Sequence, residues 1–141
     1  CANVRSTELY TMTVPTVKKI IMIEFVDTHT HLFVQEFDED RKTAVQRAVD
    51  VGVRKLCLPS ITVESLSSIL AMCEEYPGVC YPMAGLHPTE LGDDYKAMLD
   101  IIYSRLKSDN RFIAVGEVGL DFYWDDTRKK EQLDANRNKK S

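Results

Sequence analysis

The chain has 141 residues, of which 44% are hydrophobic and 28% are charged, and its formal net charge is −4. These proportions exclude a disordered or fibrous chain and are those of a folded globular domain. The acidic balance argues against a protein that binds nucleic acid through an overall basic surface. It leaves open a local basic patch or a metal that handles phosphate.

Neither a membrane segment nor a disulfide framework is evident. The apolar run Ile20–Ile23 is too short to span a membrane or to form the core of a signal peptide. The cysteines, Cys1, Cys57, Cys73 and Cys80, form no CxxC pair and no zinc-finger spacing. Because Cys57 and Cys73 lie in apolar periodic runs, we expect both to be small buried hydrophobic residues in a reducing compartment. We therefore predict a cytoplasmic location without membrane contact.

The first half of the chain contains two predicted strand–helix units. Residues 20–26 form a continuous apolar run typical of a buried strand, and Asp38 is predicted to cap the helix that follows. A second apolar run lies at residues 53–58. Thr62 is the predicted cap of a second helix, with Glu64 in the first turn, where the helix dipole favours a negative charge.

The second half repeats this pattern. Residues 79–86 form the third predicted strand, and a stripe of apolar side chains predicts a helix over residues 95–106. Residues 112–115 form the fourth strand, after which a polar helix is predicted to begin near Thr127. The unit repeats about every 30 residues, which is typical of parallel βα units.

Two α/β architectures fit four such units. Continuous apolar strands indicate a sheet covered on both faces, as in a doubly wound open sheet or a (β/α)8 barrel. No Gly-rich phosphate loop of the GxGxxG or GxxxxGK[ST] type follows any strand, which removes the commonest reason to prefer the open sheet. A complete barrel needs about 250 residues, so four units form only half of one.

All three histidines of the chain lie at predicted strand ends. His29 and His31 follow the first strand, His87 follows the third, and Glu117 follows the fourth. Parallel βα folds place their reactive groups at the carboxyl ends of the strands. We therefore expect a functional site here, although His87 taken alone fits a cap of the helix before Pro88 equally well.

The spacing of these residues suits a metal site. Side chains at i and i+2 of a strand point to the same side, so His29 and His31 are predicted to converge on one cation, with Asp27 as a further ligand or a partner that orients an imidazole. Glu117 is a candidate bridge between ions, because a buried carboxylate costs several kcal/mol unless it is paired. Imidazole with carboxylate suits zinc, manganese or iron, and a carboxylate-rich surround admits magnesium.

Three segments of the chain together resemble the TatD family of metal-dependent hydrolases. They read FVDTHTHL at residues 25–32, AGLHP at residues 84–88 and AVGEVGLDFY at residues 114–123. The Gly-Glu-x-Gly-Leu-Asp pattern in the third segment is the most specific of the three. Their order and spacing match the first half of the family, and the resemblance covers residues 22–132.

This resemblance implies a TIM-barrel-type fold, here incomplete, with two divalent ions (magnesium, manganese or zinc) that serve the hydrolysis of phosphodiester bonds in DNA. His29 and His31 match ligands of one ion, and Glu117 matches a residue that binds or bridges both. His87 matches a histidine near the substrate phosphate. The remaining candidates, expected to support the ligands from outside the coordination sphere, are Asp27 and Asp121.

The chain departs from the family pattern after residue 132. The family continues with two further metal histidines and a late aspartate, which is a ligand and the base for the attacking water, and none of them can be placed here. We therefore expect a truncated chain that is inactive alone, with its catalytic base in the missing C-terminal half. The predicted parts are an irregular extension (1–21), the half-barrel (22–132) and a polar tail (133–141).

Two other functions stay open from the sequence. Phosphoesterases and amidohydrolases also begin with an Asp-x-His-x-His segment, so another metal hydrolase is one alternative. The other is a non-catalytic half-barrel that self-associates through the exposed edges of its first and fourth strands, because unpaired strand edges promote association.

Overall fold

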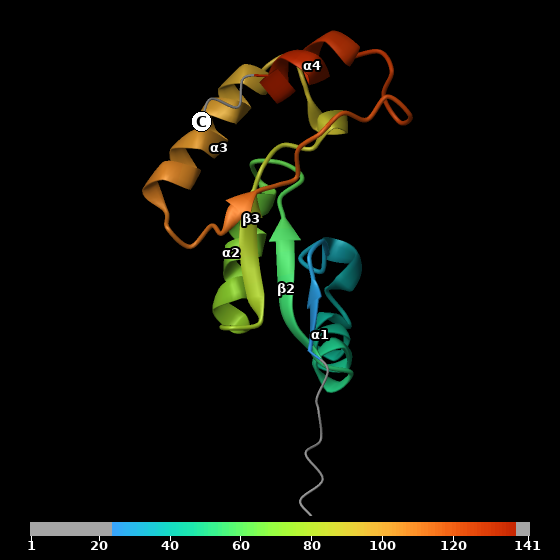
Figure 1. Ribbon diagram of the computed structural model, residues 1–141, viewed down its shortest axis with the longest axis vertical. Coiled ribbons are helices and arrows are strands. Elements are labelled where there is room, and N and C mark those ends of the chain that lie inside the picture. The colour runs from blue at the N-terminus through green and yellow to red at the C-terminus, as the bar shows by residue number, and fades with distance from the viewer. Residues whose placement is uncertain (1–23, 138–141) are drawn as a thin grey trace, which may run out of the picture.

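In the computed structural model, which describes residues 24–137, four parallel strands form one sheet in the order β1-β2-β3-β4 (Figure 1). The strands are β1 (Phe25–Asp27), β2 (Val53–Pro59), β3 (Cys80–Ala84) and β4 (Ala114–Val115). The helices are α1 (Arg41–Asp50), α2 (Ser65–Glu75), α3 (Tyr95–Ser108) and α4 (Lys129–Arg137), with short 3-10 helices η1 (Gln35–Phe37) and η2 (Pro88–Glu90). Within these residues, none of the helices has the length and apolar character needed to cross a membrane.

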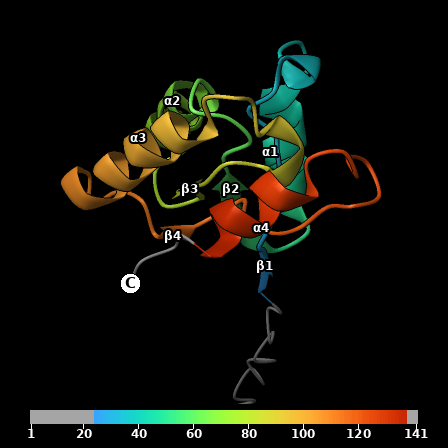
Figure 2. The same cartoon turned by 90° about the horizontal axis from the view of Figure 1, so that it is seen from above.

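Each strand lies beside the next one in the sequence, which is the strand order of half a (β/α)8 barrel. The predicted incomplete TIM-barrel-type fold is therefore confirmed. Residues 20–23, which we predicted to start the first strand, lie outside the described residues. The helices α1, α2 and α3 lie along the same side of the sheet (Figure 2), which is the arrangement of a barrel and not of a doubly wound sheet, in which helices cover both faces.

The main core lies between β2 and its covering helices. Leu56 and Leu58 of β2 are almost completely buried and pack with Val45 of α1 and with Ile69 and Met72 of α2. These helices bury one apolar face each, as the predicted stripes require. The core thereby fixes β2, with which β1 and β3 pair.

Two predicted helix caps have different outcomes. Asp38 does not cap α1: the helix begins at Arg41, whose guanidinium donates to the Asp38 carboxylate. α2 begins only at Ser65, and Thr62 precedes its N-cap residue Glu64 by two positions, but the Thr62 side chain still accepts a hydrogen bond from the first residue of the helix. The Ser65 N–H donates to Thr62 Oγ1 at 3.3 Å, and Ser65 Oγ donates to the Thr62 carbonyl at 2.7 Å. Hydrogen bonds from its own backbone N–H and from Thr62 hold the pKa of Glu64 below its ordinary value.

The described cysteines, Cys57, Cys73 and Cys80, are all free. Cys57 and Cys73 are half-buried rather than buried as predicted, whereas Cys80 is buried in the main core. Burial raises the pKa of Cys73 to about 11 and that of Cys80 to about 12. Both thiols therefore stay protonated at neutral pH and behave as small hydrophobic side chains.

The carboxyl-terminal helix extends past the predicted boundary at residue 132. α4 ends at Arg137, and Ala135 packs against a small apolar cluster that contains Tyr95 of α3. Tyr95 also donates its hydroxyl to the Asp134 carboxylate at 2.7 Å. These contacts with α3 explain why residues 133–137 are helical despite their polar sequence.

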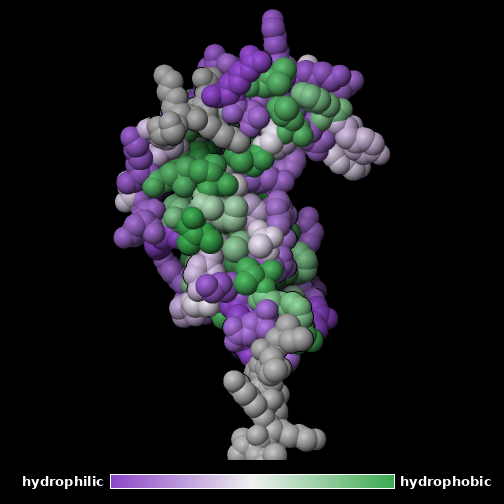
Figure 3. Space-filling model, in the orientation of Figure 1, coloured by the Kyte–Doolittle hydropathy of each residue, from purple (hydrophilic) through white to green (hydrophobic). Residues whose placement is uncertain are grey.

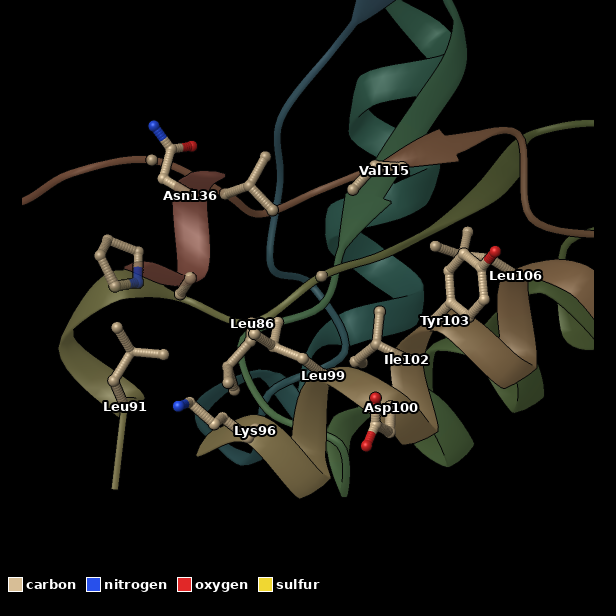
Figure 4. A pocket seen from close by; sticks show the side chains of 15 residues that line it. Leu86, Leu91, Lys96, Leu99, Asp100, Ile102, Tyr103, Leu106, Val115 and Asn136 are labelled. Carbon is tan, nitrogen blue, oxygen red and sulfur yellow. The ribbon is translucent and has the colours of Figure 1, made fainter. Parts of the chain in front are cut away.

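An apolar cavity of about 670 Å³ opens between α3 and β4 (Figure 4). Its apolar lining includes Leu86, Leu91, Leu99, Ile102, Leu106 and Val115. Hydrophobic side chains also gather on the face of the molecule seen in Figure 3. None of the predicted metal ligands His29, His31 and Glu117 lines this cavity.

Candidate metal centre

The segment after β1 carries both histidines on a well-anchored backbone. The Thr30 N–H donates to the Cys57 carbonyl at 3.1 Å, which continues the pairing with β2 beyond Asp27. Leu32 and Phe33 follow directly and are buried in the main core. The His31 ring packs edge-to-face against Phe33, with 5.6 Å between ring centroids. Core packing next to the site therefore fixes the position of His31.

The two imidazoles meet as the spacing predicts. The Nε2 atoms of His29 and His31 lie 3.0 Å apart, and the rings are nearly perpendicular, at 86°. Asp27 does not join them, because its carboxylate accepts the backbone N–H of His29 at 3.1 Å. Asp27 thus fixes the turn that carries His29, and its role as a metal ligand or as a partner of an imidazole stays a prediction.

Glu117 faces all three histidines from the end of β4. Its Oε2 lies 3.2 Å from Nε2 of His29 and 3.4 Å from Nε2 of His31, while Oε1 lies 3.4 Å from Nε2 of His87. Four side chains from three strand ends therefore meet at one point. We call His29, His31 and Glu117 the His–Glu group.

Ser60 directly follows β2 and supports the His–Glu group through hydrogen bonds to the neighbouring strand ends. Its side chain is fully buried, and Oγ donates to the Gly85 carbonyl at 2.6 Å and accepts the Gly85 N–H at 2.7 Å. The Ser60 carbonyl in turn accepts the Glu117 N–H at 3.0 Å. One serine thus connects the ends of β2, β3 and β4. No motif in the sequence indicates this role of Ser60.

Gly85 allows the ends of β3 and β4 to approach each other closely. A Cβ atom at this position would lie 2.6 Å from the Glu117 nitrogen and closer still to the Glu117 carbonyl oxygen. Contacts this short with backbone atoms require the strand ends to separate. The absence of a side chain at Gly85 therefore helps to place Glu117 beside the histidines.

His87 is both a helix cap and a neighbour of the His–Glu group. Its Nδ1 accepts the Thr89 N–H at 3.2 Å at the start of η2 and lies 2.7 Å from Thr89 Oγ1. Because a backbone N–H can only donate, these hydrogen bonds assign the ring proton of neutral His87 to Nε2. His87 therefore presents an N–H donor toward Glu117 and lacks the free Nε2 lone pair that a metal ligand needs.

His31 has a perturbed pKa. Burial is the main cause that lowers the pKa of His31, the adjacent His29 lowers it further, and Glu117 opposes both. The neutral imidazole is the form that binds a cation, because protonation removes the lone pair. The surroundings of His31 thus favour its ligand form.

The donor set of the His–Glu group fits a divalent metal. Two nitrogens that each lie about 2.1 Å from one ion are about 3.0 Å apart when the angle at the ion is about 90°. The two Nε2 atoms have this separation, and the ligand atoms of the whole group lie within 4.8 Å of one another. The group is therefore compatible with metal binding.

The predicted Asp121 lies in the loop after β4 and has a different set of partners. Its Oδ1 accepts the backbone N–H groups of Tyr123 and Trp124, both at 3.0 Å. Gln132 of α4 is fully buried and fixes the same loop, since its Oε1 accepts the Asp121 N–H and its Nε2 donates to the carbonyls of Asp121 and Asp125. A glutamine in a polar helix gives no sequence signal for this role.

Comparison with known proteins places this geometry in a family. The profile of the family described as TatD related DNase matches residues 26–137. The chain belongs to the TatD family. It is 33% identical over 113 residues to the "Uncharacterized metal-dependent hydrolase YjjV" of Escherichia coli (strain K12), which covers 79% of this chain and 43% of that protein. The resemblance that the three sequence segments indicated is thereby confirmed.

Other TatD proteins give the same result. The chain is 31% identical over 109 residues to the "3'-5' ssDNA/RNA exonuclease TatD" of Dickeya dadantii (strain 3937), over 77% of this chain and 41% of that protein. The crystal structure of YjjV from E. coli superposes with a TM-score of 0.69 and 32% identity, over 80% of this chain and 44% of that chain. The chain thus spans less than half the length of the TatD relatives it matches.

Proposed function

We propose that this chain supplies the N-terminal half of a metal-dependent TatD active site that hydrolyses phosphodiester bonds of DNA. The observation that carries the proposal is the convergence of the Glu117 carboxylate with His29 and His31 at the carboxyl ends of parallel strands. The names of two relatives, a metal-dependent hydrolase and an ssDNA/RNA exonuclease, support the same chemistry.

Each residue of the site has a proposed role. His29 and His31 would hold one ion through Nε2, and Glu117, whose Oε2 faces both of these histidines, would share its carboxylate between that ion and a second one. When bound, divalent ions (magnesium, manganese or zinc) would neutralise charge on the phosphate oxygens and acidify the attacking water. His87 donates its Nε2–H to a phosphate oxygen of the substrate, and Asp27 and Asp121 fix the loops that carry the other residues.

The chain alone is proposed to be inactive. It contains only three histidines, and the group within residues 24–137 that could hold a metal has a single carboxylate, that of Glu117. We therefore assign no general base within this chain, and we expect it to bind metal weakly and to hydrolyse DNA negligibly. Metal-dependent cleavage of DNA by purified 1–141, lost in His29→Ala and His31→Ala, would contradict the expected inactivity.

Metal binding by the purified chain tests the proposed site directly. We expect calorimetric titration with zinc or manganese to show binding that weakens at least about 10-fold in His29→Gln. His87→Gln is the matched control, because we assign His87 as a donor and not as a ligand, and its metal affinity should equal that of the parent chain. Equal binding by the parent and His29→Gln would exclude the His–Glu group as the metal site.

Substrate assays separate the proposed nuclease from other hydrolases with an Asp-x-His-x-His segment. A longer TatD-type chain that contains these residues should cleave DNA in preference to phosphomonoesters and amides. Preference for either of the latter would favour the phosphoesterase or amidohydrolase alternative.

The free, half-buried thiols Cys57 and Cys73 support a reducing location, which we propose to be the cytoplasm.

A second candidate function is a non-catalytic half-barrel that self-associates. Within the described residues, β1 pairs only with β2 and β4 only with β3, so each has one free edge. Val26 on β1 and Val115 on β4 are about half exposed, at 53% and 50%. These edges favour association with a second copy, which is compatible with a metal site on the same chain.

A further inference from the structure

Two large aromatic side chains extend into solvent from the loop between β4 and α4. Tyr123 is 84% exposed and Trp124 is 77% exposed, which makes them the most exposed large hydrophobic side chains in residues 24–137. Their rings contact each other edge-to-face, with centroids 5.0 Å apart. Two adjacent aromatic side chains with this degree of exposure are typical of a binding site, because burial of such rings is strongly favourable.

The loop that carries the two rings is fixed by hydrogen bonds. The Asp121 carboxylate accepts both of their backbone N–H groups at 3.0 Å, and the fully buried Gln132 joins the loop to α4. These hydrogen bonds hold the turn that carries the aromatic pair in one conformation, which lowers the conformational entropy lost on binding.

The aromatic pair lies at the same end of the sheet as the His–Glu group. The loop follows Glu117 directly and extends beyond the carboxyl ends of β1, β2 and β3 (Figure 1). Trp124 is seven positions after Glu117, so the extended chain between them spans at most about 25 Å. A polymer that reaches from the histidines along this end of the sheet can therefore contact both places.

We propose that Tyr123 and Trp124 form a stacking platform for the bases of single-stranded nucleic acid, an inference that rests on the proposed function of the His–Glu group. Every base presents a flat π-face, and stacking on aromatic side chains tolerates any sequence. In a duplex these faces are covered by neighbouring bases, so the platform favours single strands.

Charge near the platform supports stacking rather than phosphate binding as the source of affinity. Acidic residues of the loop and the first turn of α4 outnumber the basic ones: Asp121, Asp125, Asp126 and Glu131 against Arg128, Lys129 and Lys130. Arg128 is also paired with Asp93 at 3.1 Å. The affinity of this platform should consequently depend weakly on salt concentration, in contrast to binding that is driven by the release of counterions from nucleic acid.

Trp124 is the only tryptophan of the 141-residue chain, so its fluorescence reports on this platform alone. The probe is a single strand of about 12 nucleotides, within the roughly 4–16 nucleotides that one single-strand-binding fold covers. It is titrated into the chain in EDTA, which prevents hydrolysis. We expect saturable quenching by this strand, and little quenching by an abasic strand of the same length or by the strand annealed to its complement.

Variants complete the test. Tyr123→Ala should raise the Kd about 5- to 150-fold, and Trp124→Ala, followed by anisotropy of a labelled strand, should do the same. Tyr103→Ala is the matched control, since Tyr103 is also exposed but lies on α3, and it should bind as the parent does. Thermal melting checks that the exposed substitutions leave the fold intact.

Equal affinity for the abasic and the normal strand would overturn the platform, and so would an unchanged Kd in Tyr123→Ala. Neither result bears on metal binding by His29 and His31, which the calorimetric titration measures without nucleic acid. Failure of the platform and failure of the proposed function are therefore distinguishable.

Discussion

At the scale of single residues, His31 combines a half-buried ring with a second imidazole as its neighbour. Both surroundings disfavour the protonated ring and lower its pKa below the ordinary 6.5. We predict that the metal-free chain shows His31 titrating below pH 6.5 when its ring protons are followed by NMR. With only three histidines in the chain, His31→Gln assigns the signal. A midpoint at or above 6.5 would contradict the environment seen at the site.

The same shift links stability to pH. As the pH falls below 6.5, His31 is protonated in the unfolded chain before it is protonated in the folded chain. Proton binding therefore stabilises the unfolded state relative to the folded state. The contribution of His31 to stability is thus full above pH 6.5 and is lost as the pH falls through the lower folded pKa. Urea unfolding of the metal-free chain at several pH values should show this loss, and His31→Gln should reduce it.

At the scale of elements, Ser60 joins three strand ends through one buried hydroxyl. Ser60→Ala leaves both the N–H and the carbonyl of Gly85 without their side-chain partner. We predict a loss of about 1–3 kcal/mol in unfolding free energy, together with weaker metal binding through displacement of Glu117. Urea unfolding and calorimetry measure the two effects.

Ser67→Ala is the matched control for this prediction. Ser67 also donates to a backbone carbonyl, that of Glu64, but it lies exposed on α2. Its loss should change stability by less than about 0.5 kcal/mol. Similar losses for Ser60→Ala and Ser67→Ala would contradict the bridging role of Ser60.

Two glycines near the site provide a second comparison. Gly85→Ala introduces a Cβ that overlaps the backbone of Glu117, whereas Gly119→Ala meets nothing within 4 Å. We predict that Gly85→Ala lowers the unfolding free energy by about 1–3 kcal/mol and reduces metal affinity, because the ends of β3 and β4 must separate. Gly119→Ala should bind metal as the parent does. If both variants behave alike in calorimetry and urea unfolding, the close approach at Gly85 is unimportant.

The elements themselves were largely predictable from the sequence, whereas the contacts between them were not. Within residues 24–137, apolar runs and helical stripes predicted the order and the approximate positions of the strands and of the four α-helices, because burial dictates those patterns. The positions of His29, His31, His87 and Glu117 followed from the rule that strand ends carry the chemistry. The roles of Ser60, Gln132 and Asp38 depend on partners distant in sequence or on the residue at which a helix starts, and no periodicity encodes them.

At the scale of the whole molecule, the half-barrel leaves apolar surface open on the side of β4. The cavity between α3 and β4 is lined by leucine, isoleucine and valine, and β4 has no strand neighbour besides β3 within residues 24–137 (Figure 4). β1 at the opposite edge has exposed side chains at Phe25 and Val26. Because β1 and β4 are parallel, the free edge of β4 in one copy can pair with the free edge of β1 in another copy as a parallel neighbour.

We therefore predict that the purified chain associates with itself as its concentration rises from about 10 μM to 1 mM. Sedimentation velocity should show a growing fraction of dimer, which brings eight strands together. Val115→Lys places a charge at the free edge of β4 and should shift the chain toward monomer. Val51→Lys is the control, since Val51 is 70% exposed at the end of α1 and lies outside both edge strands. A parent chain that stays monomeric throughout, or equal association by the two lysine variants, would rule out pairing through the β4 edge.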